Sequence, residues 1–563
     1  MAETSIYLSK PWLKSYEKGV PESINYENVT MPEYLEKSAK EFADDPAMVF
    51  VGYTLTYRQF KDQVDRFAAC LTDWGIKKGD AVAILLPNSI PCVVAFYAIL
   101  KIGAIVVMNN PLYSDPELEH QFNDSGSKVL ITLDALTGRM VKLRPKTKIK
   151  QIVYTSVGDF LNPIKRFLGK KLKKFPYADV APAPDVYHWK DIIVKYPPNP
   201  PKVALTFDDI AMYQYTGGTT GVSKGVILTH GNLSKQVQQI NAWFPGFTRG
   251  KEVMLGALPY FHVFGMSCSM NLSVYMGWNQ ILIPRPQPDP LLEAIRTYRP
   301  TFTPLVPTMY IGMLNHPDLK KTDMSCIKGA FSGSAPLPVE VIHEFQKLTG
   351  AYISEGFGMT ETCPVTHMNP FRGKQKVGSV GLPCSDTLAR IVDLNDGVTD
   401  MPVGQPGELI VKGPQVMRGY KGMPEETANV LKDGWMYTGD IATMDEEGYF
   451  YIVDRKKDMI ISGGYNVYPR DIDEVYYTHP KVAEACAIGI PDPKRGENVK
   501  LFIVLKEGET ATAEEMIEYG KTRLATYKLP VEVEFRKELP KTNVGKILRK
   551  ELRAEELKKR KGN

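Results

Sequence analysis

Three apolar segments that each run into a loop of small residues constrain the fold of this chain most strongly. The segments, each followed by its loop, are IAMYQYT (210–216) with YTGGTTGVSKG (215–225), AFS (330–332) with SGSAPL (332–337), and AYIS (351–354) with EGFGMTE (355–361). Apolar runs alternate with amphipathic stretches through the first two-thirds of the chain, a pattern that is typical of α/β folds. Because ligands of such folds bind at the carboxyl ends of the strands, these loops are candidate binding sites.

The domain organisation is predicted from the chain length and from a change in the pattern of strands and turns along the sequence. A chain of 563 residues exceeds the size of a single hydrophobic core. We predict a large N-terminal α/β domain over residues 1–454 with doubly wound sheets, in which short strands and turn signals form a β-rich subdomain over residues 377–454. The charged stretch DRKKD (454–458) predicts a boundary, and residues 455–563 suffice for a small α+β C-terminal domain.

The cysteines and the apolar segments indicate the compartment. The seven cysteines are scattered without a CxxC pair, so neither a disulfide framework nor a zinc site is predicted, and a reducing, cytoplasmic location is expected. The N-terminus MAETSIYLSKPW lacks the pattern of a signal peptide. Residues 253–284 carry no formal charge, but prolines and polar residues interrupt them, so we predict a buried strand, loop and helix rather than a bilayer span.

The net charge of +5 is concentrated in two places. Residues 160–175 (FLNPIKRFLGKKLKKF) hold six basic and no acidic side chains, and residues 536–563 hold eleven basic and four acidic ones. Neither stretch has the features of a base-reading surface, so no nucleic-acid partner is predicted. On a helix, the apolar residues of 160–175 would form one arc with most basic residues outside its centre. This pattern is typical of an element that contacts an anionic membrane surface, although a surface helix packed on its own domain would look similar.

The loop 215–225 has the composition of a phosphate-binding loop. Its four glycines let backbone N–H groups point at phosphate oxygens, its threonines add hydroxyl groups, and Lys224 adds a positive charge. Walker A spacing cannot be laid onto it. Residues 221–225 (GVSKG) match the elbow of serine hydrolases, but Ser223 lies seven residues beyond Thr216 instead of at the strand end, and no HGGG motif is present. Histidines occur downstream, so composition alone leaves a hydrolase using Ser223 as an alternative.

Three further motifs carry side chains suited to nucleotide chemistry. Glu361 offers the hard oxygen ligands that Mg²⁺ takes beside substrate phosphates, and Phe357 could lie flat against a base. Asp440 in the motif YTGD could accept the hydroxyls of a ribose. Lys546 in PKTNVGKILRK (540–550) stands on a glycine-containing loop before a helix. Taken alone, each motif favours the simpler interpretation, which is a loop carboxylate and a core aromatic side chain, an aspartate in a turn, or a solvated lysine.

Taken together, the motifs make the chain resemble the adenylate-forming superfamily, in particular the acyl-CoA synthetases and the bacterial long-chain fatty-acid–CoA ligases. The matching segments, in the order of that family, are YTGGTTGVSKG, PYFHVFG (259–265), SGSAPL, EGFGMTE, YTGD, DRKKDMIISGGYNVYP (454–469) and PKTNVGKILRK. The resemblance covers roughly residues 30 to 555. Two positions depart from it, since the family often has tyrosine at Phe357 and a basic residue or histidine at Tyr437, and both changes could alter nucleotide affinity.

The resemblance implies a reaction in two halves. A medium- or long-chain fatty carboxylate attacks the α-phosphate of MgATP to give an acyl-adenylate and pyrophosphate, and the thiol of coenzyme A then displaces AMP. It also implies a mobile C-terminal domain that withdraws Lys546 between the halves. Residues 263–278 are apolar enough to line an acyl tunnel, although a core helix would look similar, and aryl acids remain an alternative substrate class. An oligomer is compatible with the sequence.

By the same resemblance, each functional role falls on numbered residues of this chain. Contacts to ATP and AMP fall on Thr216, Gly217, Gly218, Thr219, Thr220, Gly221, Ser223, Lys224, Ser332, Gly333, Ser334, Ala335, Glu355, Gly356, Phe357, Gly358, Thr360, Asp440 and Arg455. The catalytic residues are Lys546, His262 and Glu361, and the Mg²⁺ ligands are Thr216 and Glu361. The hinge falls on Lys457, and Gly463 and Gly464 would lie near the pantetheine of coenzyme A.

Overall fold

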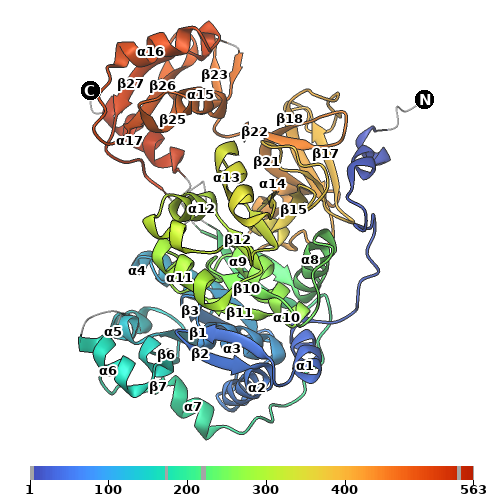
Figure 1. Cartoon of the computed structure of the whole chain (residues 1–563), viewed down its shortest axis with the longest axis vertical. Coiled ribbons are helices and arrows are strands. Elements are labelled where there is room, and N and C mark those ends of the chain that lie inside the picture. Colours follow the sequence, from blue (N-terminus) through green and yellow to red (C-terminus); the bar gives the residue numbers. More distant parts are fainter. Residues whose placement is uncertain are drawn as a thin grey trace. The chain divides into compact units, whose positions relative to one another are not determined.

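The computed structural model describes residues 5–171, 175, 177–216, 223–335, 337–463, 465–541 and 547–561 (Figure 1). Contacts within the chain divide it into two compact units. The larger unit comprises Ser15–Thr387 and Lys412–Gly434, and the smaller unit comprises Met1–Lys14, Leu388–Val411 and Trp435–Asn563. The predicted division into domains of residues 1–454 and 455–563 stays a prediction.

The larger unit contains a sheet of eight strands built mainly from residues 81–229. In spatial order the strands are β19 (Gly419–Tyr420), β9 (Lys224–Thr229), β8 (Ile210–Thr216), β4 (Ile105–Met108), β3 (Ala81–Leu85), β5 (Val129–Leu133), β6 (Gln151–Thr155) and β7 (Val186–His188). The strands from β8 to β7 pair in parallel, whereas β9 pairs antiparallel with β8 and with β19. Strands β3, β4 and β5 are buried along their whole length, as expected for a parallel sheet covered on both faces.

A second sheet of the larger unit has nine strands. In spatial order they are β16 (Leu382–Pro383), β15 (Val365–Met368), β14 (Ile353–Gly358), β13 (Gly329–Ser332), β12 (Phe302–Leu305), β10 (Val253–Gly256), β11 (Asn279–Leu282), β1 (Pro46–Phe50) and β2 (Tyr53–Thr56). The strands from β14 to β1 pair in parallel, and antiparallel strands complete both edges. The three apolar segments that precede small-residue loops in the sequence are strands of these sheets: β8 belongs to the first sheet, and β13 and β14 belong to the second.

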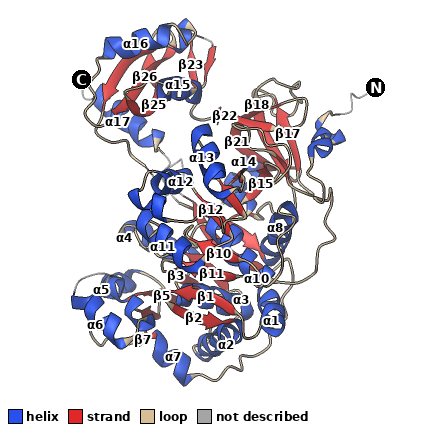
Figure 2. Ribbon diagram, viewed as in Figure 1, coloured by secondary structure: helices blue, strands red, loops and turns tan. Residues whose placement is uncertain are grey.

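Helices flank both sheets of the larger unit (Figure 2). They are α1 (Met31–Glu41), α2 (Tyr57–Asp73), α3 (Ile90–Lys101), α4 (Asp115–Ser125), α5 (Asp134–Leu143), α6 (Pro163–Lys171), α7 (Trp189–Lys195), α8 (His230–Trp243), α9 (Val263–Gly265), α10 (Leu272–Met276), α11 (Pro288–Tyr298), α12 (Pro307–Leu314), α13 (Val339–Thr349) and α14 (Pro424–Val430). The predicted helix at 92–103 is confirmed as α3, which is apolar on every side and almost wholly buried. A helix with no polar face has to lie inside the core.

In its described residues, the smaller unit combines two sheets with three α-helices. One sheet contains β17 (Leu388–Val392), β18 (Gly407–Lys412), β21 (Trp435–Met444) and β22 (Phe450–Arg455), and the other contains β24 (Tyr465–Val467), β23 (Ile460–Ser462), β26 (Gly496–Leu505), β25 (Val482–Asp492) and β27 (Pro530–Phe535). The helices are α15 (Pro469–Tyr477), α16 (Ala513–Lys521) and α17 (Arg549–Lys561). The predicted fold class is confirmed: α/β with parallel-rich sheets, a β-rich subdomain and a small α+β C-terminal part.

Two local predictions need correction. The segment EGFGMTE was expected to be a loop, but Glu355–Gly358 belongs to β14, because its backbone pairs antiparallel with β15. The predicted helix over 160–175 starts later than expected, since α6 begins at Pro163, and residues 172–174 and 176 lie outside the described residues. Phe160 lies outside it and packs edge-on against Phe50 and Tyr53, with ring centroids 5.4 and 5.7 Å away.

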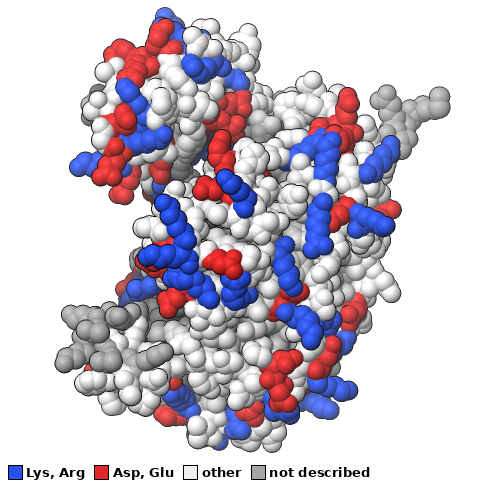
Figure 3. All heavy atoms as spheres, viewed as in Figure 1, with Lys and Arg blue, Asp and Glu red and all other residues white. Residues whose placement is uncertain are grey.

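The uncharged segment 253–284 folds as the sequence indicated. It forms β10, a short α9, a π-helical stretch Met266–Asn271, α10 and β11, and all of these are largely buried. Across the described ranges, every helix falls short of the length and apolar character that a membrane span needs. On the face shown in Figure 3, lysine and arginine side chains are interspersed with aspartate and glutamate.

Candidate active site

The stems of the loop 215–225 form a β-hairpin. β8 ends at Thr216 and β9 begins at Lys224, and these two residues are paired across the hairpin. The hydroxyl of Ser223 donates to the backbone carbonyl of Thr216 over 2.7 Å, which closes the base of the loop. The predicted residues Gly217, Gly218, Thr219, Thr220 and Gly221 lie outside the described residues. Within the described ranges no histidine bonds to Ser223 Oγ, so the geometry gives no support to a serine nucleophile.

Contacts join the hairpin to two other predicted segments of the larger unit. The side-chain amide of Gln214, on β8, donates to the carbonyl of Phe261 over 2.9 Å. Phe261 precedes His262. The ring of Phe264 lies beside Gly333, where an added Cβ would be 3.3 Å from it. The segment around His262 therefore contacts both the loop 215–225, called the phosphate-type loop below, and the loop that follows β13.

The imidazole of His262 is neutral. Burial lowers its pKa to about 4, because a charged ring would lose the stabilisation that water provides. Its Nδ1 accepts a hydrogen bond from the backbone N–H of Phe264 over 3.3 Å, so the proton is on Nε2. His262 can thus donate one hydrogen bond to a ligand but carries no charge near neutral pH.

The predicted adenine pocket consists of two neighbouring strand ends. Ser332 of β13 and Glu355 of β14 are paired in parallel register. Ser332 is buried, and in the described part of the chain its hydroxyl oxygen has no hydrogen-bond partner, as expected for a group that binds a ligand. Gly358 has no room for a side chain, because a Cβ would lie 1.8 Å from the carbonyl oxygen of Pro364. The remaining predicted residues of these strand ends are Gly333, Ser334, Ala335, Gly356, Phe357 and Thr360.

Glu361 is connected to the phosphate-type loop through a tyrosine. It lies in the 3₁₀ turn Thr360–Thr362 and is 8% exposed. The hydroxyl of Tyr420, on β19, donates to Glu361 Oε1 over 2.8 Å. The ammonium of Lys224 lies 5.0 Å from the centroid of the same ring and forms an ion pair with Glu426. These contacts connect β8, the His262 segment, β13, β14, Glu361 and β9 in one continuous series within the larger unit.

The smaller unit by itself contains another pair of predicted residues. Asp440 on β21 and Arg455 at the end of β22 are paired across the sheet. Asp440 Oδ1 lies 3.1 Å from Arg455 Nε, and Asp440 is almost fully buried. Its Oδ2 is also buried, and none of the described residues bonds to it. A buried carboxylate oxygen without a protein partner is suited to accept the hydroxyls of a ribose.

Two other predicted residues of the smaller unit, Lys457 and Gly463, lie on either side of β23 in the chain. Lys457 is exposed, and its carbonyl accepts a hydrogen bond from the guanidinium of Arg553 over 2.7 Å. Gly463 has a φ of +60°, and its N–H donates to the carbonyl of Arg495 over 2.8 Å. Gly464 and Lys546 lie outside the described residues, so their roles stay predictions.

Four residues beside the site were not found by sequence reasoning. They are His120, Asp124, Tyr420 and Glu426. The strand that holds Tyr420 has two residues and pairs with a strand almost two hundred positions earlier, so no local pattern indicates it. His120 and Asp124 are four apart on α4, a spacing that places side chains on one helix face and offered the one usable signal.

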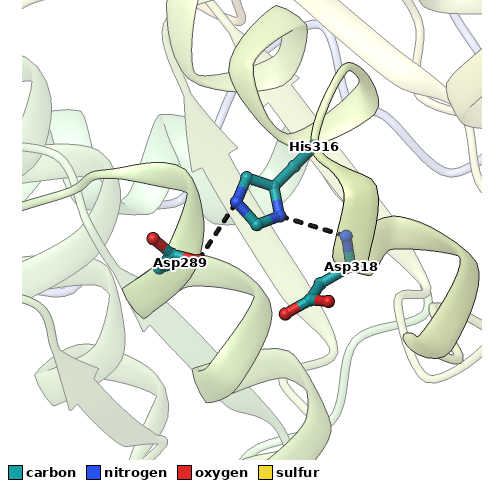
Figure 4. Close-up of side chains that lie close together, drawn as sticks. All are labelled: Asp289, His316 and Asp318. Carbon is teal, nitrogen blue, oxygen red and sulfur yellow. Dashed lines mark hydrogen bonds and ion pairs between the residues drawn. The ribbon is translucent and has the colours of Figure 1, made fainter.

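A second group of polar side chains lies away from this site. Asp289, His316 and Asp318 converge near the start of α11, with potential metal-binding atoms within 4.8 Å of one another (Figure 4). His316 Nδ1 accepts from the backbone N–H of Asp318 over 3.2 Å, and Nε2 lies 3.1 Å from Asp289 Oδ1. Both ring nitrogens are thus engaged in protein contacts, and we assign no metal to this group.

Comparisons with known proteins identify the family to which the chain belongs. Residues 35–421 match the family model described as AMP-binding enzyme, and residues 471–546 match that of the AMP-binding enzyme C-terminal domain. The chain is 44% identical over 555 residues to a long-chain-fatty-acid–CoA ligase of Bacillus subtilis (strain 168), covering 97% of this chain and 98% of the relative. It is 35% identical over 506 residues to a feruloyl-CoA synthase of an Amycolatopsis species, covering 89% and 94%.

A solved structure shares the fold along nearly the whole chain. ATP-bound MatB from Rhodopseudomonas palustris has a TM-score of 0.83 and 28% identity, covering 94% of this chain and 99% of that one. The chain belongs to the AMP-binding enzyme family.

Proposed function

We propose that this chain is an ATP-dependent long-chain fatty-acid–CoA ligase that forms an acyl-adenylate intermediate and releases AMP and pyrophosphate. The observation that carries the proposal is the similarity over nearly its full length to a long-chain-fatty-acid–CoA ligase. The contacts that link the loop stems to the other predicted nucleotide segments support a nucleotide site in the larger unit. The similarity to a feruloyl-CoA synthase makes an aryl acid the second candidate substrate.

In the first half-reaction, a carboxylate oxygen of the fatty acid attacks the α-phosphorus of ATP and the bond to pyrophosphate breaks. The loop between Thr216 and Lys224 holds the β- and γ-phosphates and steadies the pyrophosphate as it leaves. Lys546 supplies positive charge between the attacking carboxylate and the α-phosphate. Asp440 accepts the ribose hydroxyls, and Phe357 lies against adenine. Donors fixed where negative charge develops lower the barrier without reorganising during the reaction.

The residues around Glu361 fit a magnesium ion. Glu361 is nearly buried, and among the described residues its hydrogen-bond donor is Tyr420 at Oε1, which leaves Oε2 for a cation. Thr216, at the first stem of the loop, adds a hydroxyl oxygen, and carboxylate and hydroxyl oxygens are ligands that Mg²⁺ accepts beside substrate phosphates. When bound, Mg²⁺ would neutralise negative charge on the phosphate oxygens.

In the second half-reaction, the sulfur of coenzyme A attacks the acyl carbon and AMP leaves. The two half-reactions differ in nucleophile and in leaving group, so each needs different protein groups beside the reacting atoms. Residues 455–563 form the mobile domain in this proposal, with Lys457 as the hinge. Movement of this domain withdraws Lys546 from the α-phosphate and brings Gly463 and Gly464 beside the pantetheine of coenzyme A.

The proposed reaction is tested by following pyrophosphate release with fatty acids of graded chain length and with ferulate, each with and without coenzyme A. We expect long-chain acids to give the highest kcat/KM and thioester to form when coenzyme A is present. A preference for ferulate would replace the fatty-acid assignment with the aryl one. Ester hydrolysis without ATP consumption would contradict the ligase reaction itself.

The helix α6 is proposed to contact an anionic membrane surface, from which a long acyl substrate can be taken. Ile164 and Phe167 on this helix are 73% and 66% exposed, although both side chains are large and apolar. Residues 160–175 also hold six basic and no acidic side chains. Exposed apolar side chains within a basic segment suit the interface of an anionic bilayer, where both burial and charge attraction contribute.

We expect the protein to co-sediment with vesicles of phosphatidylcholine and phosphatidylglycerol, and salt to weaken this binding. Replacing Ile164 and Phe167 together with serine should lower the bound fraction several-fold, because two apolar side chains no longer enter the interface. Val194→Ser is the control, since Val194 on α7 is 81% exposed but lies outside the basic segment. The assignment of α6 to a membrane surface would be wrong if the double serine variant bound as well as Val194→Ser. It would also be wrong if the unaltered protein bound pure phosphatidylcholine vesicles as well as the anionic ones.

A further inference from the structure

The helix α4 contacts both stems of the phosphate-type loop. On the second stem, Ser223 directly precedes β9, and His120 Nε2 lies 2.9 Å from the Ser223 carbonyl oxygen. A carbonyl oxygen can accept but not donate, so His120 Nε2 carries the proton and donates this bond. On the first stem, the hydroxyl of Tyr215 donates to Asp124 Oδ2. The two stems are therefore attached to one helix by side chains four positions apart.

The surroundings make these contacts stable. Tyr215 is 4% exposed, and burial, followed by the bond to Asp124, raises the pKa of its hydroxyl well above the ordinary value, so that it remains a donor. The rings of His120 and Tyr215 meet edge to face, with centroids 6.3 Å apart. Lys421 Nζ lies 4.0 Å from Asp124 Oδ1 and offsets part of the carboxylate charge. The helix itself begins at a capping box formed by Ser114 and Glu117.

We propose that His120 and Asp124 are positioning residues that hold the two stems of the phosphate-type loop at the spacing needed to bind the phosphates of ATP. This inference rests on the proposed function, because it takes the loop to be the phosphate site. Glycine loses more backbone freedom on ordering than any other residue, so a glycine-rich loop is costly to order around a ligand. Stems that are already fixed reduce this cost, and the saving appears as affinity for ATP.

The test compares the KM for ATP with the KM for the fatty acid in the full-length protein. In His120→Leu the ring donor is lost, and we expect the KM for ATP to rise about fivefold to tenfold while the KM for the fatty acid stays unchanged. Tyr215→Phe removes the hydroxyl at the other stem and should act in the same direction. His120→Gln restores an N–H donor at similar reach, and it should recover most of the affinity for ATP.

Asn123→Ala is the matched control. Asn123 neighbours His120 and Asp124 in an open pocket on the same helix face, but its side-chain amide donates to the carbonyl of Lys146 rather than to a stem of the loop. We expect its KM for ATP to match that of the unaltered protein. An unchanged KM for ATP in both His120→Leu and Tyr215→Phe would overturn the inference, and so would a parallel rise in the KM for ATP and for the fatty acid.

A failure of the proposed function is separable from a failure of this inference. If the unaltered protein releases no pyrophosphate with any carboxylic acid, the ligase assignment is wrong and the loop contacts have another purpose. If it does release pyrophosphate and the variants retain its KM for ATP, only the positioning role is wrong.

Discussion

Replacing Lys546 with alanine is expected to slow acyl-adenylate formation by a factor of about 10² to 10³, because preorganised positive charge at the α-phosphate is lost from the transition state. The second half-reaction should persist, since thioester formation proceeds after this lysine has been withdrawn. The measurement is pyrophosphate release from ATP and fatty acid, set beside thioester formation from supplied acyl-adenylate and coenzyme A. The diagnostic result is the split between the two half-reactions rather than a loss of overall activity.

Lys541→Ala is the control for this variant. Lys541 belongs to the same basic segment, but its ammonium pairs with Glu484 at a partly exposed position, where an ion pair contributes little. It should retain both half-reactions. If Lys546→Ala forms acyl-adenylate at the normal rate, the adenylation lysine has been placed on the wrong residue. If it loses both half-reactions equally, the lysine is needed for the fold or for nucleotide binding instead.

Much of the fold could be predicted because parallel strands carry a strong local signal. β3 and β4 are continuous apolar runs in the sequence, since a strand covered on both faces has little room for polar side chains. The edge of the second sheet could not be predicted in this way. Glu355–Gly358 contains two glycines and a carboxylate, and its strand conformation comes from pairing with β15, which follows a turn later in the chain.

The candidate site shows the same limit at the level of side chains. Ser332 and Glu361 were named because their segments match motifs, but the partner that joins Glu361 to Lys224 is Tyr420. Tyr420 reaches the site because a two-residue strand returns from the β-rich region to pair with β9. A contact across so many positions depends on tertiary packing, and the single sequence contains no period or spacing that encodes it.

Glu361→Gln is expected to raise the Mg²⁺ concentration needed for half-maximal adenylation and to lower kcat/KM for ATP by about tenfold to a hundredfold, because a neutral amide is a weaker ligand for a hard cation than a carboxylate. The substitution keeps the size of the side chain, and its amide oxygen can still accept the hydrogen bond from Tyr420. A change in activity can therefore be attributed to the lost charge. The measurement is a titration of adenylation with Mg²⁺ at fixed ATP.

Two comparisons make this result specific. Glu344→Gln removes the same charge from an exposed side chain of α13 that the sequence assigns no role, and its Mg²⁺ dependence should not change. Tyr420→Phe keeps the charge of Glu361 but removes the hydroxyl that orients it, so its Mg²⁺ requirement should rise less than that of Glu361→Gln. A Glu361→Gln protein that adenylates with the normal Mg²⁺ dependence would show that this carboxylate does not hold the ion, and the ligand would then have to be sought elsewhere around the loop.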